Sequence, residues 1–580
     1  MPRRQILRRL WQYMGRSRAR LVLAVLLTLL SASLGLVGPR LSGLAIDATG
    51  VGRGQADIPL VLRLCALMAL FYALSSGLSY VLSRVTLRMT RDIVHRMRRD
   101  VFDKLVSLPV HFFDRYQAGE IISVVSYDVD TVNETLSSDF LQIVQSVVVV
   151  TVSLGMMLAI KPVLALVFLV TVPLTVVYIR WITGRTRPLF RRRGQKLGEL
   201  NGFMEEMMGG KKTIRAYGRE DRVLEAFGGR NAEAVSAYTT SEYYGSMMGP
   251  SVGFINNISL ALISVFGAAL FLAGRVGLGE IAAFVQYSRR FSGPINEAAG
   301  ILGDLQSALA AAERVFRLMD AVPEKPDAPD AAVLRDVRGD VKAEDVRFGY
   351  LPGVPVIRDF DMHARPGELV AIVGPTGAGK TTLVNLLMRF YDADAGRITV
   401  DGHDVLSLTR ASLRGAYSMV LQDSWLFYGT VLDNIAYARP GATRQEVEEA
   451  AKAAMIHGFI SRLPKGYDTV IGDDGVNISK GQKQLITIAR AMLSDARMLI
   501  LDEATSNVDT QTEQRIQQAM RKLMAGRTAF VIAHRLSTIR SADRILVVRD
   551  GNIVEQGRHE ELMEKQGFYA ELYNTQFETY

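Results

Sequence analysis

The sequence has a single cysteine, Cys65, among 580 residues. One cysteine cannot form a disulfide within its own chain, so a small disulfide-stabilised scaffold is excluded. The chain also lacks the low apolar content of disordered proteins, because 49% of its residues are hydrophobic. The apolar residues must therefore lie in folded or membrane-embedded structure.

Acidic residues are fewer than basic ones, and the formal net charge is +9. Such a surplus suits either nucleic acid or an anionic membrane surface, and the position of the charges has to decide. The mean hydropathy of +0.14 is high for a soluble protein. The charged fraction of 22% is nevertheless close to the ordinary globular value of about 25%. We therefore expect a strongly apolar part joined to an ordinary soluble part.

The apolar residues are concentrated in the first half of the chain. They form six runs, Leu21–Ile46, Ile58–Leu82, Leu141–Ile160, Val163–Ile182, Val252–Leu272 and Ile281–Leu302. A helix needs ~20 apolar residues to cross the ~30 Å hydrocarbon core of a bilayer. Five runs meet this requirement, and the sixth is marginal because it contains Arg289, Arg290 and Glu297. These lengths favour six membrane-spanning helices over the buried helices of a soluble core.

Arginines cluster before the first run and after the second and fourth runs, whereas the short connections 48–57, 161–162 and 273–280 carry little charge. The positive-inside rule then places the N-terminus in the cytoplasm, and six spans return the chain there. Much of the positive charge is thus explained by membrane topology, and no nucleic-acid partner is expected. Pro2–Met14 has apolar residues at helical spacing between arginines, which predicts a helix lying in the membrane interface.

The two long connections, Thr86–Phe140 and Thr183–Pro250, are charged and nearly free of proline. We expect them to extend the spanning helices into the cytoplasm. Short interruptions at Leu108–Asp114 and Gly209–Lys212 predict turns at which the chain reverses.

The composition changes after Met319, where Pro323–Asp330 is rich in proline and charge. Strand-like and helix-like segments alternate beyond it, which predicts an α/β fold. The expected domains are an all-α transmembrane domain over 1–320, a linker over 321–340, and an α/β domain over 341–580.

The sequence Gly374–Thr381 fits the pattern G-x-x-x-x-G-K-[ST]. A buried strand precedes it at Leu369–Val373, and a helix is expected over Thr381–Phe390. Its glycines let backbone N–H groups surround phosphates, and the helix N-terminus adds positive potential. Lys380 is then expected to reach the β- and γ-phosphates, and the Thr381 hydroxyl to ligate Mg²⁺.

A second buried strand, Met498–Glu503, ends in two carboxylates. Asp502 is placed to hold Mg²⁺, and Glu503 to act as general base toward the attacking water. Both motifs point to hydrolysis of a nucleoside triphosphate with Mg²⁺, so the α/β domain over 341–580 is expected to be a P-loop nucleotide-binding domain.

Asn477–Gln484 lies between these motifs, and here the sequence resembles the ATP-binding cassette (ABC) family. The order of six spans and one cassette is similar to that of its exporter half-transporters, of the multidrug or lipid type. The resemblance implies that ATP is bound by Tyr350, Gly374, Pro375, Thr376, Gly377, Ala378, Gly379, Lys380, Thr381 and Thr382. It implies catalytic roles for Glu503, His534, Lys380 and Gln422, and Mg²⁺ contacts for Thr381, Gln422 and Asp502. The turns near Phe112–Asp114 and Gly209–Gly210 resemble the family's coupling helices, and Asp473–Gly475 resembles a loop that contacts them.

The resemblance also implies that one cassette closes over ATP held by another. Ser479, Lys480, Gly481 and Gln482 match the signature that reaches the partner's ATP, and Asp509 ends the loop that crosses to the partner. Lys480 departs from the family pattern, which has a glycine there. An intact hydrolytic set beside a non-standard signature resembles one half of a heterodimeric exporter, whose partner has a degenerate catalytic glutamate. A homodimer is the alternative.

The sequence alone does not determine the substrate. Amphipathic drugs or lipids are the family's commonest theme, and a homodimeric lipid or peptide exporter or an importer remains an alternative. Polar residues in the later spans either line a substrate cavity or pack helices; they are Asn256, Asn257, Gln286, Tyr287, Arg289, Arg290 and Asn296. The sequence shows no organelle-targeting segment, and we expect a bacterial inner membrane with a cytoplasmic ATPase domain, surrounded by membrane lipids.

Overall fold

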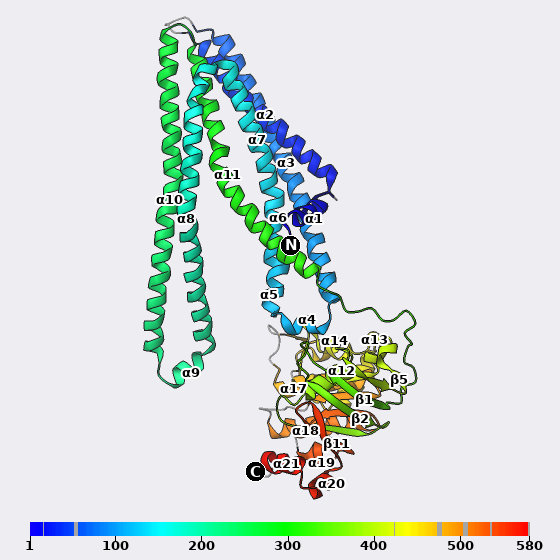
Figure 1. The fold of residues 1–580 in the computed structure, drawn as a ribbon. Coiled ribbons are helices and arrows are strands. Elements are labelled where there is room, and N and C mark those ends of the chain that lie inside the picture. Colours follow the sequence, from blue (N-terminus) through cyan, green and yellow to red (C-terminus); the bar gives the residue numbers. More distant parts are fainter. Residues whose placement is uncertain are drawn as a thin grey trace. The chain divides into compact units, whose positions relative to one another are not determined.

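The computed structural model describes residues 1–15, 17–50, 56–422, 424–472, 478–502, 509–533 and 536–577. The chain divides into two units (Figure 1). We call Met1–Leu108 with Tyr116–Val322 the helical unit, and Pro109–Arg115 with Pro323–Tyr580 the sheet unit. A helical unit followed by an α/β unit confirms the predicted fold class.

The helical unit consists of long helices joined by short turns. Its helices are α1 (Arg3–Gly15), α2 (Arg18–Asp47), α3 (Ile58–Val106), α5 (Ala118–Ser123), α6 (Val129–Glu134), α7 (Phe140–Ile160), α8 (Pro162–Gly209), α9 (Lys211–Ala216), α10 (Glu220–Leu272) and α11 (Leu278–Met319). Two π-helical turns, Val124–Asp128 and Thr135–Asp139, connect α5, α6 and α7. The sequence predicted the long helices and their two reversals, but it did not predict these π turns.

Five of the described helices are long and apolar enough to cross a membrane, namely α2, α3, α7, α8 and α10. They contain the five strong apolar runs. The marginal sixth run lies in α11, which is not among them. Helix α8 starts at Pro162, which follows an extended Lys161. Proline favours the first turn of a helix, where its missing N–H would have no partner in any case.

Small residues and side-chain hydrogen bonds join helices of this unit. A Cβ on Gly43 of α2 would lie 2.4 Å from the carbonyl oxygen of Gly279 in α11, so the two backbones touch there. The hydroxyl of Tyr287 donates to the Leu36 carbonyl (2.7 Å). The amide of Gln286 donates to Ser42 (3.1 Å). Two of the predicted polar span residues therefore pack helices in this structure.

Helices α8 and α10 run side by side to the short helix α9 (Figure 1). Beyond the apolar runs, ion pairs join them: Arg193 to Glu242 (2.6 Å) and Lys196 to Glu233 (2.8 Å). The Arg193 guanidinium also lies 4.1 Å from the Tyr238 ring centre. No residue of α9 is buried. The predicted second coupling turn is thus a helix whose side chains all reach the surface of this chain.

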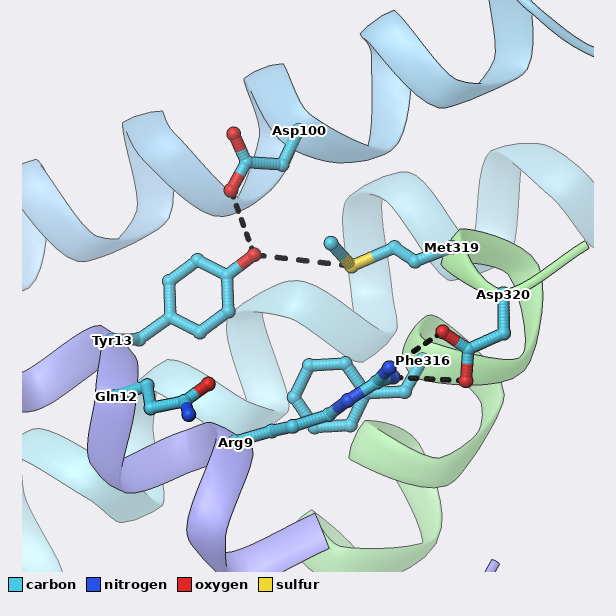
Figure 2. A pocket seen from close by; sticks show the side chains of 7 residues that line it. All are labelled: Arg9, Gln12, Tyr13, Asp100, Phe316, Met319 and Asp320. Carbon is cyan, nitrogen blue, oxygen red and sulfur yellow. Dashed lines mark hydrogen bonds and ion pairs between the residues drawn. The ribbon is translucent and has the colours of Figure 1, made fainter. Parts of the chain in front are cut away.

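Helix α1 is fastened to the ends of α3 and α11 (Figure 2). Its buried residues Ile6, Leu10 and Met14 recur every four positions and form one face. Two further contacts are made by polar side chains. Arg9 pairs with Asp320 through both guanidinium nitrogens (2.9 and 2.7 Å), and Tyr13 donates to Asp100 (2.7 Å). They line a cavity of about 340 Å³ together with Gln12, Phe316 and Met319.

The sheet unit is built on a ten-stranded sheet of order β5-β4-β1-β2-β12-β11-β3-β10-β9-β6. The strands are β1 (Val341–Phe348), β2 (Ile357–Ala364), β3 (Leu369–Val373), β4 (Ala395–Val400), β5 (His403–Asp404), β6 (Tyr417–Val420), β9 (Met498–Asp502), β10 (Thr528–Ile532), β11 (Arg544–Arg549) and β12 (Asn552–Gly557). Strands β11, β3, β10, β9 and β6 are parallel, whereas β1, β2, β4 and β5 pair antiparallel. A separate pair joins β7 (Gly429–Thr430) to β8 (Val470–Ile471).

Helices cover both faces of the parallel strands. The helices of the sheet unit are α4 (Val110–Arg115), α12 (Lys380–Leu387), α13 (Arg410–Gly415), α14 (Val431–Ala436), α15 (Arg444–Ala453), α16 (His457–Ile460), α17 (Lys480–Ser494), α18 (Thr510–Met524), α19 (Leu536–Arg540), α20 (His559–Glu564) and α21 (Phe568–Phe577). Along β3, Ala371 and Val373 belong to one core, and Val370 and Ile372 to another. Because both faces are buried, the strand reads as an unbroken apolar run.

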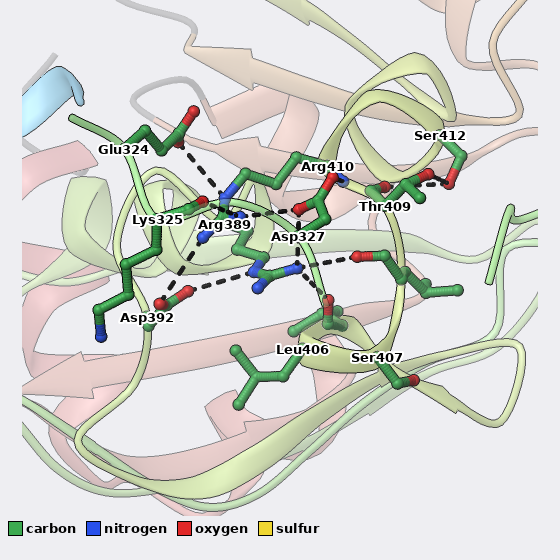
Figure 3. Close-up of polar contacts among 12 residues, drawn as sticks. Glu324, Lys325, Asp327, Arg389, Asp392, Leu406, Ser407, Thr409, Arg410 and Ser412 are labelled. Atoms are coloured by element: carbon green, nitrogen blue, oxygen red, sulfur yellow. Dashed lines mark hydrogen bonds and ion pairs between the residues drawn. The ribbon is translucent and has the colours of Figure 1, made fainter. Parts of the chain in front are cut away.

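The proline-rich linker lies on the sheet unit, held by ion pairs (Figure 3). Asp327 accepts hydrogen bonds from the backbone N–H (3.0 Å) and guanidinium (2.7 Å) of Arg410. Glu324 accepts from Arg414 (2.5 Å) and lies 3.4 Å from Nε of Arg410. Arg410 is buried, whereas the side chains of Asp327 and Glu324 are 28% and 30% exposed. We call Glu324, Asp327, Arg410 and Arg414 the linker clamp.

Replacing Arg410 with Met should destabilise the sheet unit. The change leaves two partly buried carboxylates without their shared cation, which we expect to cost about 2 kcal/mol, below the 3–5 kcal/mol of a fully buried pair. A loss of this size lowers Tm by about 4–8 °C in a unit of this length. Thermal unfolding followed by circular dichroism measures it.

The matched control is Arg439→Met, which breaks an ion pair with Glu446 whose side chains are 44% and 43% exposed. Exposed pairs contribute about 0–1 kcal/mol, so its Tm should change by a few degrees at most. Equal Tm losses in the two variants would contradict the stabilising role of the linker clamp.

Candidate functional site

The predicted phosphate-binding loop joins β3 to α12. Gly377 and Gly379 have positive φ values of 84° and 101°, a region that residues with a Cβ rarely adopt. A Cβ on Gly374 would lie 2.2 Å from the carbonyl oxygen of Val548. The glycines are thus required for the tight curl of the loop and for its approach to β11. The loop ends where α12 starts, with the N–H groups of the first turn of that helix.

Lys380 is buried at the start of α12, with 9% of its surface exposed. Its Nζ donates to the carbonyl oxygens of Gly374 (2.8 Å) and Pro375 (2.9 Å). Burial lowers the pKa of Lys380, and the charge of Asp502 opposes this effect. A cation inside a curled loop at a helix N-terminus is the arrangement that binds phosphate groups.

Asp502 and Gln422 follow neighbouring parallel strands at the same edge of the sheet. Asp502 ends β9 and pairs with Ile532 of β10, which in turn pairs with Ile372 of β3. Gln422 comes two residues after β6, whose Val420 pairs with Leu501. The carboxyl ends of these strands therefore place both side chains on the side of the sheet that carries the phosphate-binding loop.

Hydroxyl, amide and carboxylate oxygens are suitable ligands for Mg²⁺. Thr381, Gln422 and Asp502 supply one oxygen donor of each kind. Among the described residues, no group of three His, Cys, Asp or Glu side chains could hold a metal by itself. This donor set fits Mg²⁺, which usually takes one or two protein ligands and completes its shell with water and substrate phosphates.

Tyr350 lies beside the first turn of α12. Its hydroxyl donates to Oγ1 of Thr382 (3.1 Å) and accepts from the Asn385 amide (3.3 Å). Its ring packs edge-on against Phe348, with the ring centres 5.0 Å apart. Because 38% of Tyr350 stays exposed, an aromatic surface is available next to the phosphate-binding loop. The structure thus brings Tyr350, Lys380 and Thr382 together.

The predicted signature forms the start of α17. Ser479 caps this helix: its hydroxyl accepts from the Gln482 N–H (3.3 Å), and the Gln482 side chain accepts from the Ser479 N–H (3.0 Å). Gly481 is buried, whereas Lys480 is exposed in the first turn. Asp509 caps α18 through its side chain, which accepts a hydrogen bond from the Thr512 N–H (2.9 Å), and this bond lowers the pKa of Asp509.

The predicted catalytic Glu503 and switch His534 lie outside the described residues, as do Asp473–Gly475 and Ser506–Val508. Their neighbours in sequence are described. Asp502 ends β9, and the N–H of Ala533 donates to Ile372 (3.2 Å), so residues 503 and 534 each follow a strand of the parallel core. Their catalytic roles stay predictions.

Two groups of residues with structural roles were not predicted from the sequence. One is the set of linker-clamp arginines, which no short motif marks. The other is Tyr391, whose hydroxyl contacts Asp114 of the predicted coupling turn. A signal existed in the run Phe390–Asp392 directly after the P-loop helix, where a loop combines aromatic and acidic residues. Two histidines outside the predicted site, His457 and His559, bond to Tyr467 and Tyr569.

Comparison with known proteins identifies both units. Residues 21–295 match the model of the ABC transporter transmembrane region, and residues 357–506 match the ABC transporter model. The chain is 42% identical over 573 residues to YfiC of Bacillus subtilis, described as an uncharacterized ABC transporter ATP-binding protein, covering 99% of this chain and 94% of the relative.

Two further likenesses cover most of the molecule. A fatty acid ABC transporter ATP-binding/permease protein of Mycobacterium bovis is 45% identical over 528 residues, which is 91% of this chain and 83% of the relative. A solved bacterial Atm1-family ABC exporter with ATP bound superposes with a TM-score of 0.77 at 32% identity, over 97% of this chain and 98% of that one. The chain therefore belongs to the ABC transporter family as an exporter-type member, in which a transmembrane region and an ATPase coupled to transport share one polypeptide.

Proposed function

We propose that this protein exports amphipathic or hydrophobic compounds, lipids or drugs, by alternating access driven by ATP hydrolysis, as one subunit of a dimer. The observation that carries the proposal is the complete phosphate-binding loop with Lys380 buried in it, in one chain with five described helices long and apolar enough to span a membrane. In the proposed arrangement α11 is the sixth span, so that the N-terminus and the ATPase domain both lie in the cytoplasm of a bacterial cell, and the spans lie in its inner membrane.

Hydrolysis would use the side chains around the loop. Lys380 exchanges its two carbonyl contacts for β- and γ-phosphate oxygens, and Tyr350 stacks on adenine. Thr381, Gln422 and Asp502 would hold Mg²⁺, which neutralises charge on the phosphates. Water attacks the γ-phosphorus, the bond to the β–γ bridging oxygen breaks, and ADP leaves with that electron pair. Glu503 accepts the proton of the attacking water, and His534 contacts the γ-phosphate.

Two features of the chain support a dimer. No residue of α9 is buried, although this helix ends a long pair of ion-paired helices, so it has a full surface available for another subunit. Ser479, Lys480 and Gln482 are accessible at the start of α17, where they would reach ATP held by the partner. Lys480, with the hydrolytic set otherwise intact, favours a partner of different sequence over a second copy.

Relatives at high coverage support the proposed substrate class. The Mycobacterium bovis relative is named as a fatty acid transporter, and another, 35% identical over 508 residues in Syntrophus aciditrophicus, as an ATP-dependent lipid A-core flippase. Both names describe molecules with long acyl chains and a charged head. We therefore favour an acyl-chain amphiphile over a hydrophilic peptide.

The variant Glu503→Gln in the assembled transporter should bind ATP like the wild type but turn it over at least about 100-fold more slowly. The amide keeps the shape of the side chain but cannot accept the proton, and general-base catalysis contributes about 10²- to 10⁴-fold. Binding of a fluorescent ATP analogue and phosphate release measure the two quantities. Turnover near that of the wild type would remove Glu503 from its assigned role.

Transport direction can be tested with radiolabelled oleate as the probe. Inside-out membrane vesicles should accumulate it when ATP is supplied outside, and vesicles carrying Lys380→Ala should not, because that variant lacks the phosphate-binding cation. Accumulation by right-side-out vesicles loaded with ATP would instead indicate an importer. ATP-independent uptake that is equal in both preparations would argue against oleate as a substrate.

The partner can be identified by purifying the tagged chain from its own cells in mild detergent. A heterodimer should yield a second half-transporter in equal amount, with a standard signature and a replaced catalytic glutamate. In that complex Lys480→Gly should leave turnover within about twofold, because Lys480 then faces the inactive ATP site. Recovery of this chain alone as an active dimer would establish the homodimer.

A further inference from the structure

The short helix α4 belongs to the sheet unit, although the chain on both sides of it belongs to the helical unit. Its contact with the sheet unit includes a charge-assisted hydrogen bond, in which the Tyr391 hydroxyl donates to Oδ2 of Asp114 (2.5 Å). The His111 ring lies 6.2 Å from the Tyr391 ring, measured between centres. Tyr391 is thus a residue through which α4 is held.

The Tyr391 ring also contacts aromatic residues beside the candidate ATP site. Its centre lies 5.0 Å from that of Tyr350, with the two rings nearly perpendicular at 88°, and 5.4 Å from that of Phe348. Such edge-to-face contacts add about 0.5–1.5 kcal/mol to the packing of aromatic rings. Because the Tyr350 hydroxyl donates to Thr382, a continuous set of contacts runs from Asp114 to the phosphate-binding helix.

The backbone that carries Tyr391 is held rigidly. Arg389 is 6% exposed, has a φ of 50°, and donates to the carbonyl oxygens of Val405 and Leu408 (2.9 Å each). Its Nε also donates to Asp392 (3.2 Å). Arg414 of the linker clamp donates to the Arg389 carbonyl (2.9 Å). A shift of α4 is therefore transmitted to the Tyr391 side chain rather than absorbed by the loop.

Burial, and secondly the hydrogen bond to Asp114, raise the pKa of Tyr391 above its ordinary value. The hydroxyl therefore stays protonated and remains a donor throughout the physiological pH range. The hydrogen bond can be lost by movement of α4 but not by titration of Tyr391.

We propose that Tyr391 is a positioning residue that links docking of α4, through Asp114, to the orientation of Tyr350 in the ATP site. The proposal rests on the proposed function, because it takes Tyr350 as the residue that stacks on adenine. When α4 is docked, the Tyr391 ring is fixed, and it supports the Tyr350 ring from its edge. When α4 withdraws, Tyr391 loses its acceptor, and Tyr350 loses that support.

The experiment measures kcat and KM for ATP in the assembled transporter reconstituted in phospholipid vesicles. Tyr391→Phe keeps the ring and removes the donor, and Asp114→Ala removes the acceptor. Each should lower kcat about threefold, near the low end for an ordinary intramolecular hydrogen bond, and raise KM by no more than about twofold, because the ring stays beside Tyr350 but is fixed less firmly. The double variant should be no slower than either single variant, because both remove the same bond.

Two further variants separate positioning from general packing. Asp114→Asn should restore most of the kcat, because its amide oxygen still accepts from Tyr391. Tyr391→Leu removes the ring beside Tyr350 and should raise KM for ATP at least about threefold, in line with the loss of one aromatic contact. The matched control is Tyr569→Phe, which removes a buried hydroxyl bonded to Nδ1 of His559 (2.7 Å) and should leave both constants unchanged.

Three outcomes would each overturn the proposal. They are a wild-type kcat for Tyr391→Phe, additive losses of kcat in the double variant, and a kcat of Asp114→Asn as low as that of Asp114→Ala. An unchanged KM in Tyr391→Leu would overturn the link to Tyr350. Lys380→Ala, measured in parallel, keeps these outcomes separate from the proposed function. If it abolishes hydrolysis, the ATP site stands whatever the Tyr391 variants show; if it does not, the site itself is wrong.

Discussion

The structure depends most on the burial of one ammonium group, that of Lys380. A buried cation is costly unless polar groups surround it, and here two backbone carbonyls of the phosphate-binding loop do so. They are weaker partners for a cation than phosphate oxygens. The ammonium group therefore gains interaction energy when phosphate oxygens replace the two carbonyl oxygens. The glycines, the parallel strands and the N-terminus of α12 all serve to keep this group in place.

The same helix connects the site to the rest of the chain. Its first turn carries Lys380, and the segment after its last turn carries Arg389 and Tyr391, which contact the linker region and α4. Arg389 and Tyr391 follow within four residues of the end of this eight-residue helix. One short stretch of chain thus carries the phosphate-binding cation and the contacts to α4 and to the linker, which gives the proposed coupling a short physical route.

The sequence was sufficient where a structural requirement acts on consecutive residues. Apolar runs of membrane length predicted α2, α3, α7, α8 and α10, and the glycine pattern with its flanking strand predicted the loop around Lys380. It was insufficient where the requirement joins distant segments. Asp327 meets Arg410, and Asp114 meets Tyr391, only after the chain has folded, so neither pair has a local pattern. The roles of Gln286 and Tyr287 could not be predicted either, because the sequence cannot distinguish a polar span residue that packs helices from one that binds substrate. In the structure both residues join helices.

Lys480 carries an electrostatic cost that its own helix does not offset. It stands in the first turn of α17, where the helix dipole is positive, and that turn holds no acidic residue. A cation in this position costs about 0.3–1 kcal/mol and gains only when an anion approaches. A triphosphate held by a facing cassette is such an anion, and an added lysine would bind it more tightly than the family's glycine does. Tighter binding slows the separation of the two cassettes after hydrolysis. Slow separation costs less at an ATP site that holds its nucleotide and hydrolyses it rarely. Lys480 therefore favours a partner of different sequence, with a degenerate catalytic glutamate.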